Sequence, residues 1–380
     1  MKYLYQKTNR FFAQVSTGME ESGVAELSEL GAKQVEPAFR GIHFRADHAG
    51  LYRANYLART LTRILAPLKT FRCPDPDALY REARAVPWPE IFSVDRTFAV
   101  FANVSHSNIT HSQFAGLRLK DAVVDRFRQE LNRRPNIDPR NPDLWLNLHL
   151  HKNTATLSLD TSGGSLHRRG YRLNALEAPM QETLAAAIIR LSEWNGGRPL
   201  YDPMCGAGTL LCEGLMHGAR IPAGFLRPRF GFQFLPDFDE TLWRAVKKDA
   251  DQEIHPLPAG RIQGSDASTR AVDIALENTR TLPHGERVRI TQARFQDMSG
   301  LEDGVLVCNP PYGVRMGDKP AVGDLIAAFG DFLKQRCKGS AAFLYFGDRE
   351  LIKRVGLKPA WKKPLRNGPL DGRLVKYELY

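Results

Sequence analysis

The sequence predicts an α/β protein in which small α+β modules precede a larger, doubly wound sheet that is mostly parallel. Three observations support this fold class. From about residue 197, apolar strand patterns alternate with amphipathic helices, as in parallel sheets that carry helices on both faces. Before about residue 160, short strands and short helices alternate. Residues 361–379 hold two extended stretches around turn residues, so an antiparallel hairpin is expected at the C-terminus.

The elements of the first half follow from local patterns. Residues 75–86 begin with an acidic residue and a proline, as helix starts often do. Val123, Val124, Phe127 and Leu131 share one face of a helix predicted over 119–131. Further strands are predicted at 11–16, 41–46, 64–71 and 97–105, and further helices at 19–30 and 51–60.

Residues 144–160 are the clearest hairpin in the chain. Leucines at 144, 146, 148 and 150 alternate with tryptophan, asparagine and histidines, and a second alternating run follows after Lys152 and Asn153. This period of two, with turn residues between the runs, predicts two antiparallel strands that each bury one face.

The second half predicts five strands with helices between them. This alternation predicts a parallel, doubly wound sheet. The predicted strands are 199–203, 261–266, 288–293, 304–309 and 341–347, and the best helices are 268–280 and 322–336.

Composition limits the classes of function. The net charge of +11 in 380 residues favours a polyanionic partner such as nucleic acid. No run is long and apolar enough for a membrane span, and the first residues lack a signal-peptide core, so a cytoplasmic protein is expected. The five cysteines are odd in number and form no CxxC pair. They are interpreted as buried small residues, and neither disulfides nor a metal site are expected.

Three stretches of the second half carry candidate ligand chemistry. Residues 200–215 form a strand, a turn with Gly206 and Gly208, and a helix, which lets a ligand approach backbone amides. No lysine follows, so a nucleoside triphosphate is not expected. Asp266 ends the second strand and can accept ribose hydroxyls or simply cap the next helix. Asp297 follows the third strand, where it can accept from an adenine amino group or remain a solvated loop residue.

The sequence CNPPYG at 308–313 ends the fourth strand with two prolines, which cannot extend a sheet. Four features thus follow four successive strands in order: the glycine turn, Asp266, Asp297 and the NPPY sequence. Residues 165–380 thereby resemble the class I S-adenosylmethionine-dependent methyltransferases that methylate amines and carry NPPY. The resemblance implies a Rossmann-like domain and S-adenosylmethionine as the cofactor.

The resemblance also implies roles for individual residues. Asn309 and the carbonyl of Pro310 would accept both N–H groups of a planar amine, Pro311 would stiffen the turn, and Tyr312 would stack on the base. Cofactor contacts are implied for a larger set of residues: Pro179, Glu182, Thr183, Asp202, Gly206, Gly208, Thr209, Asp266, Asp297 and Asn309.

The first half is similar to two modules that accompany such domains. Residues 65–160 resemble a THUMP domain, which binds RNA, and residues 1–64 resemble a ferredoxin-like module. Residues 161–196 would then be a linker with a helix that covers the cofactor, and 197–380 the methyltransferase domain. Clustered arginines are candidates for contacts with RNA phosphates, with a solvated basic surface as the alternative: Arg133, Arg134, Arg168, Arg169, Arg172 and Arg227.

The whole chain is similar to bacterial THUMP-containing RNA guanine-N2 methyltransferases, in particular to the N-terminal half of those that methylate 23S ribosomal RNA. The function predicted is methylation of guanine N2 in RNA, most simply 23S rRNA. A tRNA guanine-N2 enzyme fits the same residues. A DNA adenine-N6 enzyme, a protein-glutamine methyltransferase and a non-catalytic RNA-binding factor are weaker alternatives. The oligomeric state and the target nucleotide do not follow from the sequence.

Overall fold

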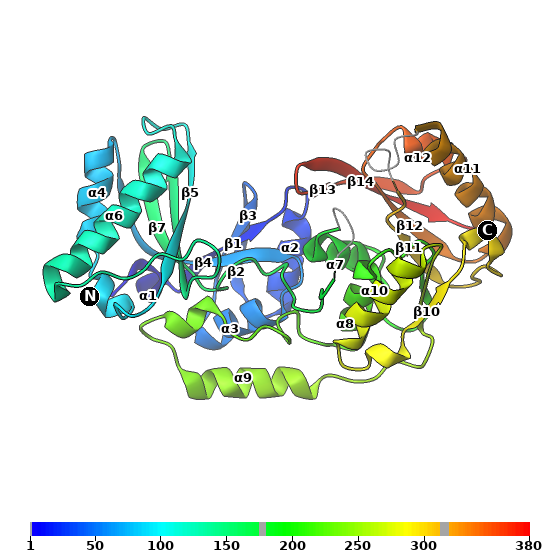
Figure 1. Cartoon of the computed structure of the whole chain (residues 1–380), viewed down its shortest axis with the longest axis horizontal. Coiled ribbons are helices and arrows are strands. Elements are labelled where there is room, and N and C mark those ends of the chain that lie inside the picture. The colour runs from blue at the N-terminus through cyan, green and yellow to red at the C-terminus, as the bar shows by residue number, and fades with distance from the viewer. Residues whose placement is uncertain (1, 175–179, 312–318) are drawn as a thin grey trace. The chain divides into compact units, whose positions relative to one another are not determined.

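The computed structural model describes residues 2–174, 180–311 and 319–380. The chain forms two compact units, each of which contains one seven-stranded sheet (Figure 1). Unit 1 comprises the residues up to Val15, Val24–Leu166 and Arg227–Lys247. Unit 2 comprises Ser16–Gly23, His167–Leu226 and Lys248–Tyr380. Neither unit is a single continuous segment of the chain.

The sheet of unit 1 has the strand order β2-β3-β1-β4-β7-β6-β5. All neighbours pair antiparallel except β5 and β6, which are parallel. The long strand β4 joins the two halves of this sheet, because it pairs with β1 at one end and with β7 at the other. The strands are β1 (Arg10–Val15), β2 (Lys33–Ala38), β3 (Gly41–Arg45), β4 (Leu61–Arg72), β5 (Phe98–Ser105), β6 (Leu144–His151) and β7 (Thr154–Asp160).

Six helices accompany this sheet in sequence. Helix α4 begins as predicted, since the Asp75 side chain accepts from the amide of Ala78 at 2.7 Å and Pro76 opens the first turn. Helix α6 is longer than the pattern suggested. The helices are α1 (Leu4–Thr8), α2 (Glu20–Glu29), α3 (His48–Leu57), α4 (Pro76–Arg84), α5 (Trp88–Ile91) and α6 (Ser112–Leu131).

The predicted 144–160 hairpin is confirmed as β6 and β7. Lys152 and Asn153 have φ of 48° and 57°, the left-handed pair that a two-residue hairpin turn of the favoured handedness requires. Strand β2 was not predicted. Four of its six residues are exposed and two are half-buried, so no buried face creates an alternating pattern.

Unit 2 has the strand order β10-β9-β8-β11-β12-β14-β13. Strands β8 to β12 are parallel, and the C-terminal hairpin adds β14 antiparallel to β12. The predicted fold class is therefore confirmed, including the hairpin. The strands are β8 (Leu200–Asp202), β9 (Ile262–Asp266), β10 (Arg289–Gln292), β11 (Val305–Cys308), β12 (Ala341–Phe346), β13 (Trp361–Asn367) and β14 (Leu370–Glu378).

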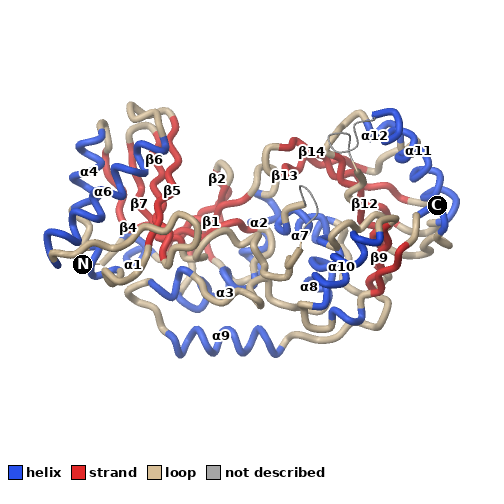
Figure 2. The backbone as a smooth tube through the Cα atoms, in the orientation of Figure 1, coloured by secondary structure: helices blue, strands red, loops and turns tan. Residues whose placement is uncertain are grey.

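The strand order of unit 2 reverses between β8 and β11, which places a ligand site at the carboxyl ends of these two strands. Figure 2 shows the strands in red and the helices in blue. The helices are α7 (Glu182–Leu191), α8 (Thr209–Gly218), α9 (Glu240–Gln252), α10 (Thr269–Arg280), α11 (Lys319–Arg336) and α12 (Leu351–Arg354), with short 3-10 turns η1 (Gly231–Phe234), η2 (Gly285–Arg287) and η3 (Phe295–Asp297). Helix α9 begins in unit 1 and ends in unit 2.

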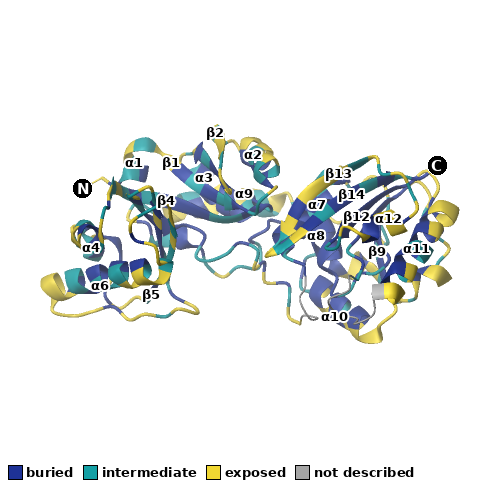
Figure 3. Ribbon diagram, turned by 90° about the horizontal axis from the view of Figure 1, so that it is seen from above, coloured by how far each residue is buried: buried dark blue, intermediate teal, exposed yellow. Residues whose placement is uncertain are grey.

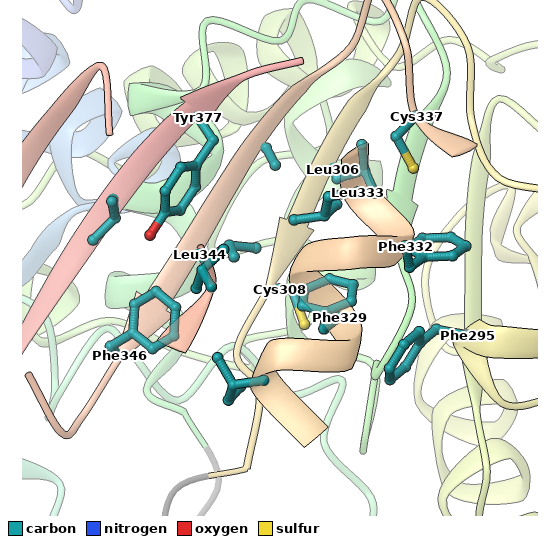
Figure 4. Packing of buried hydrophobic residues seen from close by; sticks show 14 of the residues in the cluster. Phe295, Leu306, Cys308, Phe329, Phe332, Leu333, Cys337, Leu344, Phe346 and Tyr377 are labelled. Carbon is teal, nitrogen blue, oxygen red and sulfur yellow. The ribbon is translucent and has the colours of Figure 1, made fainter. Parts of the chain in front are cut away.

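The core under helix α11 fixes the end of β11, which carries the candidate site. Figure 4 shows Phe329 and Leu333 of α11 packed near Leu306 and Cys308 of β11. All residues of β11 and β12 are buried, and β12 is dark blue in Figure 3. Because both faces of these strands are apolar and covered, the position of the residue that follows β11 is strongly constrained.

The five cysteines are all free and buried, and their burial agrees with the prediction that they are buried small residues. No helix of the described residues has both the length and the hydrophobicity that crossing a bilayer requires. The same residues contain no group of three or more metal-ligating side chains arranged to hold an ion.

Candidate active site

A cavity of about 550 Å³ opens at the carboxyl ends of β8, β9 and β11, at the reversal of strand order. It gathers six of the predicted site residues from segments far apart in the sequence: Asp202, Gly206, Thr209, Asp266, Asn309 and Pro311. Predictions made from separate strand ends therefore converge on one cavity of a size that accommodates a small ligand.

The glycine turn between β8 and α8 forms one wall of this cavity. Gly206 and Gly208 have φ of 52° and 76°, a region that glycine adopts without strain. Gly208 is the N-cap of α8, and no side chain caps the helix there. The first amides of α8 are thus available to an anionic group, and Thr209 and Leu210 line the cavity at this point.

Asp266 ties the glycine turn to the end of β9. One carboxylate oxygen accepts from the amide of Gly206 and the other from the amide of Ser268, both at 2.9 Å. Each oxygen retains a lone pair, so the carboxylate can still accept from a ligand hydroxyl. Asp266 is therefore both an organiser of the turn and a candidate ligand contact.

Asp202, at the end of β8, is a buried acid, only 2% exposed. Burial raises the pKa of its carboxyl to about 8, and the nearby charge of Asp266 acts in the same direction. The amide of Met204 donates to it at 3.2 Å and partly offsets this rise in pKa. The side chain of Cys308, the last residue of β11, also bonds to Asp202. A cationic ligand group beside this carboxyl would favour its ionised form and pair with it.

Asn309 follows β11 directly and lines the cavity. Its Oδ1 is buried and has no hydrogen-bond partner among the described residues. Native proteins rarely leave a buried acceptor without a partner, because its desolvation then goes uncompensated. An N–H donor supplied by a ligand would complete this site.

The linker before α7 supplies a second buried polar cluster. Arg172 donates to the carbonyl of Met180 at 2.8 Å and to Thr209 Oγ1 at 3.1 Å, and it pairs with Glu182 at 3.3 Å. Glu182 Oε2 and Thr183 Oγ1 are buried without a hydrogen-bond partner among the described residues. Neither Glu182 nor Thr183 lines the cavity, whereas Met180 does.

The structure corrects the role predicted for Arg169. Its side chain is 1% exposed, and its Nε donates to Glu213 of α8 at 3.2 Å. Tyr171 donates to the same carboxylate oxygen at 3.1 Å. Such a buried, paired guanidinium cannot face an RNA phosphate in this conformation, and Arg169 instead anchors the linker to α8. Arg172 is likewise turned inward, although it is partly exposed.

The other predicted arginines lie at different places. Arg168 and Arg134 are exposed, and Arg133 is exposed beside Asp95. Arg227 is half-buried in unit 1, where it donates to the backbone carbonyls of Ser162 and Ser165, so its visible role is structural. Pro179 and Tyr312 lie outside the described residues.

Asp297 does not line the cavity. It ends the turn η3 and is exposed, whereas Phe295 and Gln296 of the same turn line the cavity wall. The sequence pattern did not indicate this 3-10 turn. Asp297 was therefore predicted as a cavity residue, whereas the neighbouring Gln296 lines the cavity. Met180, Met204 and Leu325 also line the cavity without having been predicted, since isolated apolar residues carry no distinctive pattern.

Three family models match consecutive parts of the chain. The RMKL-like methyltransferase domain matches residues 169–376. The THUMP domain matches 73–160, and the RlmL ferredoxin-like domain matches 10–65. The chain belongs to the RMKL-like methyltransferase family. This family is dependent on S-adenosylmethionine, which confirms the cofactor predicted from the sequence.

Two relatives are similar to this protein over nearly the whole chain. A Synechocystis protein provisionally named an RNA methyltransferase is 39% identical over 374 residues, which cover 98% of this chain and 97% of that protein. The ribosomal RNA large subunit methyltransferase K/L of Syntrophotalea carbinolica is 38% identical over 383 residues, covering 97% of this chain. The chain spans 53% of that relative, about half its length.

Solved structures show the same fold. A provisionally assigned methyltransferase in complex with SAH is 29% identical, with a TM-score of 0.86 over all of this chain and 99% of the other. TrmN from Thermus thermophilus has a TM-score of 0.70 over 98% of this chain and 99% of its own, and its 19% identity supports the fold alone. The RMKL-like assignment thus rests on sequence and structure together.

Proposed function

We propose that this protein transfers a methyl group from S-adenosylmethionine to the exocyclic N2 amine of a guanosine in RNA, most simply in 23S rRNA. The observation that carries the proposal is Asn309, whose buried Oδ1 lacks a partner and which shares one cavity with Asp202, Asp266 and the glycine turn. An acceptor held in this way is suited to an amine that donates two N–H groups.

The residues present fit the cofactor. The uncapped amides of α8 suit the carboxylate of its methionine part, and the buried Asp202 suits the ammonium group. Asp266 has lone pairs left for ribose hydroxyls, and Phe295 and Gln296 line a wall on which the adenine can lie. When bound, the sulfonium supplies an electrophilic methyl group.

The protein's own part in the reaction is orientation of the amine. Asn309 Oδ1 and the carbonyl of Pro310 would accept the two N–H groups, which reduces conjugation of the nitrogen lone pair with the ring. The prolines restrict the backbone torsions, so these acceptors are held before the substrate arrives. The amine becomes cationic as it is methylated and then loses a proton readily, so no strong general base is needed. The target base must leave its stack to reach such a pocket.

RNA as the substrate class is supported by three features. The chain carries a THUMP match, relatives are named as RNA or ribosomal RNA methyltransferases, and the net charge is +11. These features fit a cytoplasmic RNA-modifying protein. A tRNA guanine is the alternative target within the same chemistry, because no residue of the described cavity distinguishes the two RNAs.

One structural relative favours a second candidate. A protein from Listeria monocytogenes described as a predicted N6-adenine-specific DNA methylase has a TM-score of 0.84 and is 26% identical. Adenine N6 presents the same pair of N–H groups to Asn309. DNA therefore belongs in the test.

The test uses purified protein, methyl-labelled S-adenosylmethionine and three substrates: undermodified 23S rRNA, total tRNA and DNA. Each product is digested to nucleosides, which are identified by mass. Label in N2-methylguanosine from rRNA is the expected result. Label in N2-methylguanosine from tRNA alone would replace the substrate and keep the reaction. Label in N6-methyladenosine or its deoxy form would contradict the N2 assignment.

A further inference from the structure

Around strands β5, β6 and β7, no helix of the described residues lies on one of the two faces of the sheet in unit 1. Helix α6 packs on the opposite face, where Gly116 approaches Val100 and Ala102 of β5. In Figure 1, α4 and α6 lie on the same side of β5 and β7. Because successive side chains on a strand point to opposite faces, the buried leucines of β6 point toward these helices. His149 and His151 of β6 therefore point away from them.

The strand register assembles a polar surface around these two histidines. His149 lies opposite Asn103 of β5 and Thr156 of β7, and His151 lies opposite Ser105 and Thr154. Beyond β7, the edge of this surface is formed by Thr70 and Arg72 of β4. We call this surface the histidine face: Thr70, Arg72, Asn103, Ser105, His149, His151, Thr154 and Thr156. Six of these residues are exposed, and His151 and Thr156 are half-buried.

Hydrogen bonds within the histidine face fix its side chains. Ser105 Oγ and His151 Nδ1 are 3.0 Å apart, and the hydroxyls of Thr70 and Thr156 are also 3.0 Å apart. The rings of His149 and His151 are nearly parallel, with centroids 6.3 Å apart and an interplanar angle of 17°. The surface thus presents aligned imidazoles among hydroxyl and amide groups, which can both donate and accept.

Strands β4 to β7, which carry the histidine face, have more cationic than acidic side chains. Strands β4 to β7 contain a single carboxylate, Asp160, which is buried and paired with Arg63. That pair closes the inner end of the face, because Arg63 stacks over Phe101 at 4.4 Å and over Trp145 at 5.3 Å from the ring centroids. Outside it, Arg72 is a cation with no neighbouring acid on the face. A polyanion therefore meets no repulsion from these strands.

We propose that the histidine face binds an unpaired segment of the substrate RNA, with bases stacked on the imidazoles and their edges bonded to the Asn, Ser and Thr side chains. Unpaired bases are the part of RNA that aromatic side chains on a sheet can reach, whereas duplex RNA hides them. The proposal rests on RNA being the substrate. It names a surface of this chain that is distinct from the basic helix α6.

The experiment measures binding of a fluorescent, unstructured RNA of about ten nucleotides to the whole protein by anisotropy. Asn103→Glu places a negative charge on the face, and His149→Ala with His151→Ala removes the rings. Gln113→Glu is the matched control, since Gln113 is exposed on α6 and gains the same charge. We expect binding to weaken about tenfold or more in both face variants, as loss of a stacked base does. Binding by Gln113→Glu should stay within about twofold of wild type.

Each alternative result has a distinct meaning. Unchanged affinity in the face variants, with RNA binding intact in the wild type, would overturn the proposal and leave the proposed function standing. Weakening by Gln113→Glu alone would assign the RNA to α6. Preference of the wild type for duplex RNA would also overturn it. If Asn103→Glu unfolds, Thr156→Glu places the charge on the same face from strand β7, and methyl transfer should then show a higher KM with kcat unchanged.

Discussion

At the scale of single residues, the candidate site combines groups that the sequence identifies and groups that it hides. Asp202, Asp266 and Asn309 end or follow strands, so their positions follow from the order of the strands. Arg169 illustrates what is hidden. A run of basic residues predicts a solvated surface. The structure shows instead that Arg169, one residue of this run, pairs with the buried Glu213. Gln296 and Asp297 are consecutive residues of a 3-10 turn, and the sequence has no apolar pattern that predicts which of them lines the cavity.

Asn309→Ala tests the acceptor role. The variant loses the buried oxygen that would hold the amine, whereas cofactor contacts on β8 and β9 remain. We expect methyl transfer to fall by about 100-fold or more, the usual effect of losing one preorganised group. The dissociation constant of S-adenosylmethionine, measured by calorimetry, should change by no more than a few-fold. Wild-type turnover in this variant would remove Asn309 from the mechanism.

Asp202 makes a prediction about protons. Its pKa of about 8 keeps the carboxyl largely protonated at pH 7, and a nearby ammonium group favours the ionised form. Binding of S-adenosylmethionine at pH 7 should therefore release a proton from Asp202, and affinity should rise with pH until about 8. Calorimetry in buffers of different ionisation enthalpy counts the protons. Asp202→Asn should abolish this release, and equal release by both proteins would exclude Asp202 as its source.

At the scale of elements, the strands and helices with a strong period were predictable, and exposed or short elements were not. The hairpin β6–β7 and strands β8, β9, β11 and β12 were predicted because burial imposes an apolar pattern. Strand β10 was predicted although none of its residues is fully buried. Strand β2, helix α9 and the short α12 were missed, since their residues are largely exposed or too few to show one. The predicted domain boundaries at 64, 160 and 196 remain predictions.

Two glycines of unit 1 should respond in opposite ways to alanine. A Cβ on Gly231 would lie 1.9 Å from the carbonyl oxygen of Asp160, so Gly231→Ala should destabilise unit 1 by about 1–3 kcal/mol or more. A Cβ on Gly116 would meet Ala102 and Val100 at 3.7 Å, and Gly116→Ala should stabilise α6 by up to about 1 kcal/mol. Thermal unfolding of both variants measures these shifts. Equal stability of the two would contradict the packing at Gly231.

At the scale of the whole molecule, sequence order and structural units disagree. Residues 227–247 lie within the span matched by the methyltransferase family, yet they belong to unit 1. Trp243 of α9 packs against Tyr56 with ring centroids 5.3 Å apart, and Phe232 packs against Tyr52 at 4.6 Å. Composition cannot reveal such an exchange, because an aromatic residue does not indicate which distant segment it will cover.

Trp243→Ala should distinguish the two units. Loss of this buried ring should destabilise unit 1 by about 3–5 kcal/mol, while S-adenosylmethionine binding in unit 2 remains close to wild type. Hydrogen exchange read by mass spectrometry should become faster in α3 and β4 and remain unchanged in α8. Trp361→Ala, at a half-buried position on β13, is the control. Uniform acceleration in both units would show that they unfold as one.

The same insertion has a consequence for how the protein is made. Synthesis on the ribosome delivers residues up to 166 first, then the glycine turn and α8, and only afterwards the segment 227–247. Until that segment emerges, Tyr52 and Tyr56 lack the aromatic rings that cover them in the finished protein. The first unit is therefore expected to complete its folding late in translation. An expression boundary drawn after residue 166 would release the nascent chain with this aromatic surface open to aggregation.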